Sequence, residues 1–146
     1  MAGHWGNLKV GMTGETDLAL LLRGMSPHRH DGLYVYVMVP AEIPAGAHPV
    51  VTVREAEGLT LVLSQAEADA LNLPYDYLAA WITLQVHSAL EAVGLTAAVS
   101  RVLTAAGISC NIVAGFTHDH LFVPHDRAGD ALRELASLSQ NQDSPA

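Results

Sequence analysis

The chain is poor in cysteine and in positive charge. It contains one cysteine, Cys110, which cannot form an internal disulfide or a multi-cysteine metal site. Seven Lys and Arg residues stand against fifteen Asp and Glu residues, a formal net charge of -8, and no segment concentrates the cations. These shortages argue against a disulfide-stapled secreted scaffold and against a nucleic-acid partner, and they favour the reducing cytoplasm.

Long apolar runs are also missing. The longest uncharged stretch, residues 102–117, is interrupted by two glycines and an asparagine and falls short of the roughly 20 apolar residues that cross a bilayer. Residues 1–12 lack the basic head and the continuous apolar stretch of a signal peptide. We therefore expect a soluble chain with no export signal and no membrane partner.

Apolar side chains are abundant. Of the 146 residues, 50% are hydrophobic and only 15% are charged, and the mean hydropathy is +0.25. Chains that stay disordered have the opposite composition. The length suits one compact domain or two small ones, so the protein is expected to bury a core without staples.

The first half of the chain predicts a helix, a strand, a hairpin and a second helix. A helical spacing of leucines follows a cap at Thr16 and stops at Pro27. Ser64 and Glu67 have the spacing of a capping box, which predicts the start of the second helix. The expected segments are a strand at 7–12, a helix at 18–25, a strand at 33–39, a hairpin at 50–63 and a helix at 64–71.

The second half has clearer periodicities, which predict a strand at 81–87, a helix at 95–106, strands at 108–114 and 119–124, and a helix from about 126 to 138. Gly107 has the position of a C-terminal helix cap, and residues 139–146 are predicted to be a disordered tail. This order contains five of the six elements of a ferredoxin-like βαββαβ unit. One edge strand is missing, and we expect the first half to be a second such unit that shares or exchanges a strand with the first.

Three segments of the second half resemble the ACT domain: residues 86–96 (VHSALEAVGLT), 106–111 (AGISCN) and 118–124 (HDHLFVP). Upstream, residues 54–60 (REAEGLT) resemble the companion unit of small proteins that carry two ACT domains, similar to the paired regulatory domains of aspartokinases. The chain is too short to contain a kinase domain as well.

The resemblance implies an α+β protein in which two ferredoxin-like ACT units, residues 1–78 and 79–138, lie side by side with antiparallel sheets. It also implies a small-molecule ligand, usually an amino acid, at the seam between units. Its binding positions would be Ser88, Glu91, Val93, Gly94, Leu95, Asn111 and Ile112.

The chemistry of residues 88–95 is compatible with this expectation. A loop that enters a helix attracts anions, because the first helical amides lack internal partners and the helix dipole is positive there. Gly94 would let a carboxylate approach the backbone, Ser88 adds a hydroxyl donor, and Glu91 would hold an ammonium group. Gly94→Val is then expected to abolish binding with little loss of the fold. The alternative is structural: Gly94 relieves a tight turn and Glu91 complements the helix dipole from solvent.

Two further polar residues leave alternatives open. Asn111 interrupts an apolar strand, so its amide needs partners if it is buried, and these are either a ligand or a neighbouring strand or loop. Arg54 is able to meet a carboxylate, although the adjacent Glu55 and Glu57 favour a surface ion pair.

The hypothesis that the protein is an enzyme depends on its histidines and on the cysteine. His118 and His120 would share a strand face and suggest a zinc site helped by Asp119, His87 or His125, yet no helical His-Glu-x-x-His accompanies them. Cys110 lies in an apolar strand, where a cysteine is usually a small buried hydrophobe.

We therefore expect a cytoplasmic, non-enzymatic regulatory or sensor protein that needs no cofactor, binds an amino acid and forms a homodimer. The two alternatives are a small metal-dependent enzyme that uses His118 and His120, and a structural dimer without a ligand.

Overall fold

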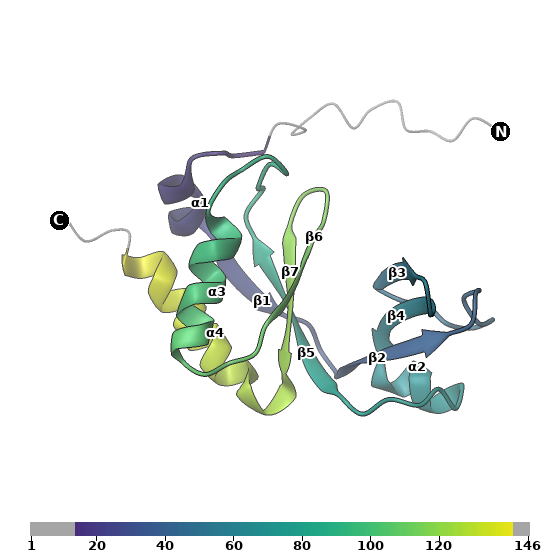
Figure 1. Cartoon of the computed structure of the whole chain (residues 1–146). Coiled ribbons are helices and arrows are strands. Elements are labelled where there is room, and N and C mark those ends of the chain that lie inside the picture. The colour runs from purple at the N-terminus through teal and green to yellow at the C-terminus, as the bar shows by residue number, and fades with distance from the viewer. Residues whose placement is uncertain (1–13, 142–146) are drawn as a thin grey trace.

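The computed structural model describes residues 14–141, which form helices packed on antiparallel strands (Figure 1). The expected strand at 7–12 and most of the expected tail lie outside these residues. In chain order, the helices and strands are α1 (Leu18–Gly24), β1 (Ser26–Arg29), β2 (Tyr34–Val39), β3 (Val51–Glu55), β4 (Gly58–Ser64), α2 (Gln65–Ala70), β5 (Leu78–Gln85), α3 (Leu95–Ala105), β6 (Asn111–Ala114), β7 (Asp119–Pro124), the 3-10 helix η1 (His125–Arg127) and α4 (Ala128–Gln140).

The strands pair in the order β3-β4-β2-β5-β7-β6, and β1 also pairs with β5. All these pairings are antiparallel. Between β2 and β5 the ladder is only two residue pairs long, Tyr34 with Ala79 and Val35 with Leu78. The antiparallel sheets of the two halves are thus joined through the beginning of β5.

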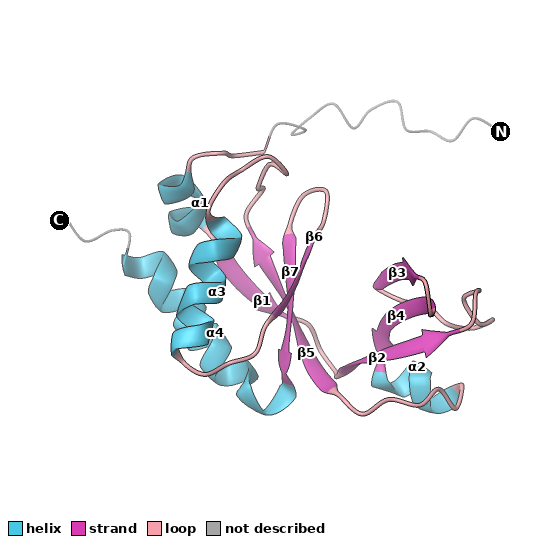
Figure 2. Ribbon diagram, in the orientation of Figure 1, coloured by secondary structure: helices cyan, strands magenta, loops and turns pink. Residues whose placement is uncertain are grey.

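The C-terminal half is a complete ferredoxin-like unit because the N-terminal region supplies its missing edge strand. Strands β1, β5, β7 and β6 lie side by side in that order, and α1, α3 and α4 cover one face of them (Figure 2). Leu22 and Met25 of α1 are buried in the same core as Val99 and Leu103 of α3 and Leu135 of α4. The strand exchange expected from the sequence therefore occurs through β1.

The N-terminal half contains the strands β3, β4 and β2 and the beginning of β5. Helix α2 packs against β2 and β4, and this half has its own cluster of buried side chains: Val35, Val37, Val39, Ala47, Leu59, Leu61, Leu63 and Ala68. A loop at 40–50 connects β2 to β3, the position that a helix occupies in a βαββαβ unit.

Several expected boundaries shift in the structure. The cap of α1 is Asp17 rather than Thr16, since the Asp17 side chain accepts a hydrogen bond from the amide of Leu20 at 3.1 Å. Pro27 lies within β1 instead of ending a helix. A proline cannot donate a hydrogen bond to a strand ladder, but it is tolerated in β1 because that strand is at the edge of the sheet. The Ser64 hydroxyl does cap α2, by accepting from the amide of Glu67 at 3.2 Å.

The second half differs mainly at the ends of its elements. Strand β5 runs from Leu78 to Gln85 rather than over 81–87, and β6 begins at Asn111 rather than at 108. Helix α4 continues to Gln140, so the predicted start of the tail at 139 is wrong. The helix continues because Leu138 packs against the core and the Ser139 hydroxyl donates to the backbone carbonyl of Arg23 at 3.3 Å.

Within residues 14–141, none of the helices has both the length and the apolar character needed to span a membrane.

Candidate ligand-binding site

In the loop between β5 and α3, Gly94 has a backbone conformation that residues with a side chain rarely adopt. Gly94 is the N-cap of α3 with φ of 107°, in the left-handed region that favours glycine. Leu18 of α1 packs directly over it: a Cβ placed on Gly94 would come within 2.9 Å of Leu18 Cδ2. Leu18 thus packs against Gly94, and because φ there disfavours any side chain, we now expect Gly94→Val to destabilise the fold as well.

The segment that precedes α1 holds this loop in place. The Glu15 amide donates to the carbonyl of His87 at 2.8 Å, and the Ala89 amide donates to the carbonyl of Glu15 at 3.1 Å. On the other side, the Ser88 amide donates to the carbonyl of Thr117 at 3.2 Å. A side chain at Gly14 would overlap the backbone of Ala89. These contacts fix the loop backbone before any ligand arrives.

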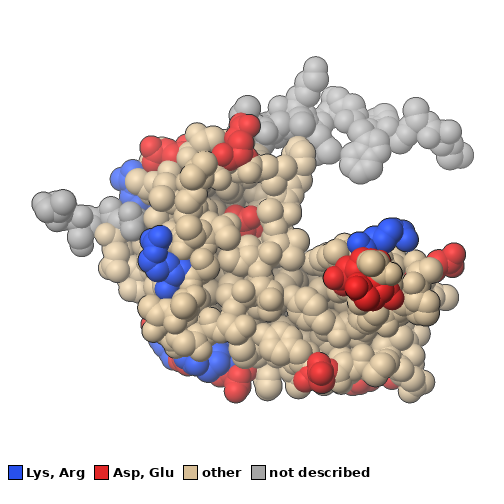
Figure 3. Space-filling model, in the orientation of Figure 1, with Lys and Arg blue, Asp and Glu red and all other residues tan. Residues whose placement is uncertain are grey.

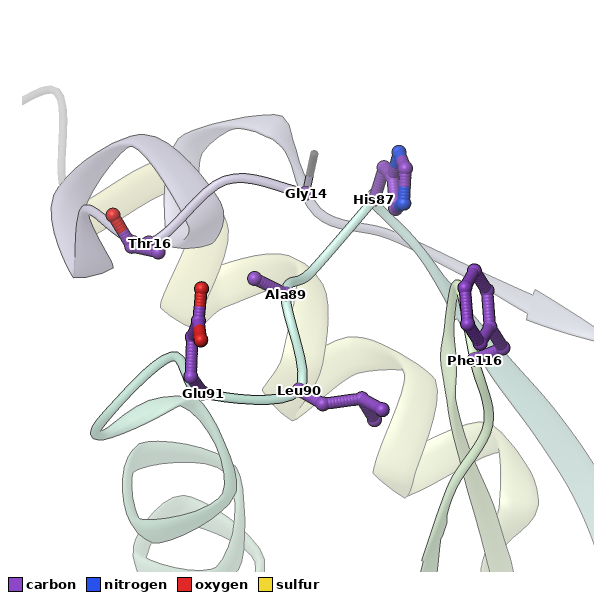
Figure 4. A pocket seen from close by; sticks show the side chains of 7 residues that line it. All are labelled: Gly14, Thr16, His87, Ala89, Leu90, Glu91 and Phe116. Carbon is purple, nitrogen blue, oxygen red and sulfur yellow. The ribbon is translucent and has the colours of Figure 1, made fainter. Parts of the chain in front are cut away.

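A hollow of about 420 Å³ opens beside the loop, and we call it the loop hollow. Figure 4 shows Thr16 and Glu91 along one side of it and Leu90 and Phe116 toward the other. The remaining lining residues are Gly14, His87 and Ala89. Glu91 is the lining residue that carries a formal charge at neutral pH, so the loop hollow favours a cationic group.

A smaller recess of about 80 Å³ lies between the loop, the start of α3 and the β6–β7 turn. Leu95 and Thr96 bring the first amides of α3 to it, and no side chain caps these amides. Asp119 also lines the recess. Burial raises the pKa of the Asp119 carboxyl, and the neighbouring His120 and His118 oppose that rise. The recess thus combines an anion-attracting helix start with a half-buried carboxyl group.

The structure brings together only part of the predicted site. Ser88 is buried and Glu91 is exposed at the rim of the loop hollow. Val93 is 83% exposed, whereas Leu95 belongs to the core. These residues share the loop with Gly94.

The two predicted residues of β6 lie away from the loop. Asn111 is exposed at the far end of β6, and Ala114, at the other end, is the β6 residue that lines the recess. Ile112 packs against the core under the helices. Arg54 is exposed on β3, at the opposite end of the strand order from β6.

The structure also adds residues that sequence reasoning did not assign to the site. Gly14 and Thr16 come from a segment more than seventy positions upstream of the loop, and no local pattern indicates that contact. Phe116 and Asp119 come from the β6–β7 turn. A sequence signal was available for Asp119, because it is an acidic residue at the start of a strand. That strand pairs with β5, and β5 leads into the loop.

The residues of the enzymatic alternative already have partners in the protein. His118 Nδ1 lies 3.0 Å from the carbonyl of Val86, and His120 Nδ1 is hydrogen-bonded to Thr83 and Trp81. In the described part of the chain, no three His, Cys, Asp or Glu side chains are grouped as a metal site would require. Burial raises the pKa of the Cys110 thiol to about 11, which disfavours a thiolate nucleophile at neutral pH.

Comparisons with known proteins agree with this architecture. Residues 13–80 and residues 78–137 each match a family model described as an ACT domain. The chain belongs to the ACT domain family. The ferredoxin-like βαββαβ fold and the two-ACT arrangement predicted from the sequence are thereby confirmed, and family membership supports a regulatory, ligand-binding role in general.

Solved structures resemble this ACT protein over most of its length. A Vibrio cholerae protein of unknown function, described as a possible transport protein, is 45% identical, with a TM-score of 0.77 over 84% of this chain and 96% of that one. The ligand-free regulatory subunit of aspartate kinase from Thermus thermophilus is 11% identical, with a TM-score of 0.57 over 77% of this chain and 95% of that one, a likeness of fold alone. No curated protein matches the chain.

Proposed function

We propose that the protein is a cytoplasmic, non-enzymatic regulator or sensor that binds an α-amino acid beside residues 86–94. The observation that carries the proposal is a pair of neighbouring spaces that share Ala89 and Leu90: the loop hollow, where Glu91 offers a carboxylate, and the recess at the uncapped start of α3. In this arrangement the ammonium group of the ligand meets Glu91 and its carboxylate meets the helix amides. The volume of about 420 Å³ leaves room for a side chain.

We further propose that the chain divides into ACT units at residues 78 and 79. In support, the two halves have separate clusters of buried side chains. α1 and β1 precede this boundary but pack into the C-terminal core, so they would connect the N-terminal segment to the ligand loop. That connection supplies a route by which an occupied site changes the position of the N-terminal segment.

A thermal-shift screen of the twenty amino acids identifies the ligand, because a ligand that binds only the folded state raises its stability. With that ligand, Glu91→Gln should weaken binding by about tenfold, since it removes a charge-assisted hydrogen bond at an exposed position. Titration calorimetry measures the change. Glu57→Gln, an exposed carboxylate in the β3–β4 turn, is the matched control and should leave the affinity unchanged.

Asp119→Asn separates the two acidic partners of the site. Unchanged affinity for this variant, together with a loss for Glu91→Gln, places the ammonium group in the loop hollow. A loss for Asp119→Asn alone places it in the recess and contradicts the role of Glu91. No stabilisation by any amino acid would contradict the proposed ligand class.

The site also has features that favour a second copy of the chain. Leu90 is 66%, Val93 is 83% and Phe116 is 64% exposed, and all three lie around the loop hollow or within the loop. Among the described residues, strand β6 ends the sheet, which leaves one of its edges unpaired there. We expect a homodimer that covers these side chains, with the ligand at the seam.

Sedimentation equilibrium tests this association. We expect a species of twice the 15.5 kDa chain mass, and Val93→Asp should shift it toward the monomer because the substitution places a charge in an apolar contact. Val53→Asp, which charges an exposed valine on β3, is the control. A single 15.5 kDa species at high concentration would contradict the dimer. A dimer that no amino acid stabilises would favour a structural role instead.

A further inference from the structure

A second hollow lies between the two halves, against the sheet face that α3 and α4 leave uncovered. Its volume is about 190 Å³, and we call it the interlobe hollow. Its lining residues come from β3 and the residue before it, and from β5, β6, β7 and the residue after β6: Val50, Val51, Trp81, Val113, Gly115, His120 and Phe122. The space-filling view shows the notch that separates the β3–β4 lobe from the larger lobe (Figure 3).

The walls of the interlobe hollow are aromatic and apolar. Trp81 and Phe122 lie nearly parallel, with their ring centroids 6.3 Å apart and their planes at 17°. Val50, Val51 and Val113 complete the apolar lining, and no Asp, Glu, Lys or Arg is among the lining residues. An ion would lose its hydration here without a partner, so the hollow favours an uncharged molecule.

His120 is the polar side chain of the interlobe hollow, and its hydrogen bonds determine which ring nitrogen carries the proton. The Trp81 indole, which can only donate, donates to His120 Nδ1 at 3.1 Å. His120 Nδ1 is therefore unprotonated, and the Thr83 hydroxyl oxygen lies 2.9 Å from the same nitrogen. The Thr83 oxygen is also hydrogen-bonded to His30 Nε2 at 2.7 Å. The hydrogen bond from Trp81 thus places the proton of the neutral His120 ring on Nε2.

That Nε2–H group lies beside another lining residue of the interlobe hollow. His120 lines the interlobe hollow, and its Nε2 lies on the side of Gly115, where a Cβ would come within 3.1 Å of it. Gly115 has no side chain to cover the group. Burial and the neighbouring His118 lower the pKa of His120, which keeps the ring neutral at physiological pH, although Asp119 opposes this effect. The interlobe hollow thus presents one donor between aromatic walls.

We propose that the interlobe hollow is a second binding site, specific for a small uncharged aromatic molecule that carries one hydrogen-bond acceptor. The ring would stack beside Trp81 and Phe122, and its acceptor would receive the hydrogen bond from His120 Nε2. The volume of about 190 Å³ suits a single substituted ring. The site shares no lining residue with the loop hollow, so it stands or fails independently of the proposed amino-acid site.

Two nearly isosteric probes test the donor. Acetophenone carries a carbonyl where ethylbenzene carries a methylene, so the pair differs mainly in the acceptor. The chain has two tryptophans, Trp5 and Trp81, so Trp5→Phe leaves one indole N–H resonance to follow by NMR. We expect acetophenone to shift this resonance and to bind about tenfold more tightly than ethylbenzene.

Steric variants locate the site. In the Trp5→Phe background, Val113→Phe should fill the interlobe hollow and abolish the shift, whereas Val53→Phe, on an exposed valine that does not line it, should leave the affinity unchanged. If Val113→Phe does not fold, Val50→Phe replaces a lining residue that is 38% exposed and tolerates a larger side chain. Equal affinities for the two probes, no shift with either, or an equal loss in Val53→Phe would each overturn the proposal.

Discussion

Replacing Leu22 by alanine should lower the free energy of unfolding by about 2 to 5 kcal/mol, the usual cost of truncating a buried leucine. Leu22 is 4% exposed, and although it lies on α1 it packs in the core of the C-terminal half. The substitution would leave a cavity beneath α3 and α4, far along the chain from its own position. The size of the loss therefore measures how much the N-terminal segment contributes to that core.

Leu20→Ala is the matched control for this experiment. It makes the same change on the same helix, but Leu20 is 47% exposed, so the expected change is within about 0.5 kcal/mol. Urea denaturation followed by far-ultraviolet circular dichroism gives both values. Similar small losses in the two variants would mean that α1 does not pack into the C-terminal core in solution.

Gly94→Ala is expected to destabilise the protein for two separable reasons. A φ of 107° costs a residue with a side chain about 1 to 3 kcal/mol, and moving the Leu18 methyl away from the new Cβ adds about 0.5 to 1.5 kcal/mol. Gly107→Ala is the control for the first cost, because φ there is 72° and nothing lies within 4 Å of the added Cβ. The difference between the two variants combines the contact with Leu18 and the larger backbone strain at φ of 107°.

A double-mutant cycle checks that difference. In a Leu18→Ala background, Gly94→Ala should lose the overlap and cost less than in the original background. Thermal and urea unfolding of the four proteins supply the comparison. If Gly94→Ala costs the same in both backgrounds, Leu18 does not lie over Gly94. Because these variants perturb folding, Glu91 rather than Gly94 is the position at which to test ligand binding.

The predictable parts of the fold are those with strong local periodicity. The β-branched and aromatic run at β2 and the apolar stripe of α3 lie within a residue or two of their expected bounds. The Ser64 cap of α2 is observed as well, because its two partners are three residues apart. Strand β1 was missed, since its sequence Ser-Pro-His-Arg has low strand propensity and only its pairing with β5 makes it extended.

The candidate site was likewise predictable only where it depends on neighbouring residues in the sequence. Residues 88–95 were expected to form a loop before a helix, and Glu91 does line a hollow there. Gly14, Thr16 and Phe116 join it through contacts between distant segments, which leave no trace in local spacing. Asn111 and Ile112 belong to β6, whose last residue, Ala114, lines the recess. Both lie nearer the other end of the strand, away from the loop.

By itself, the sequence of this ACT protein determined the ferredoxin-like class, the loop before α3 and the absence of any disulfide, since each depends on composition or on residues a few positions apart. The tertiary structure alone decided that β1 completes the C-terminal sheet, that Leu18 packs against Gly94, and that Trp81 sets the protonated nitrogen of His120. These features require segments distant in the chain to meet. Their positions follow from the packing of the whole core, to which every buried side chain contributes.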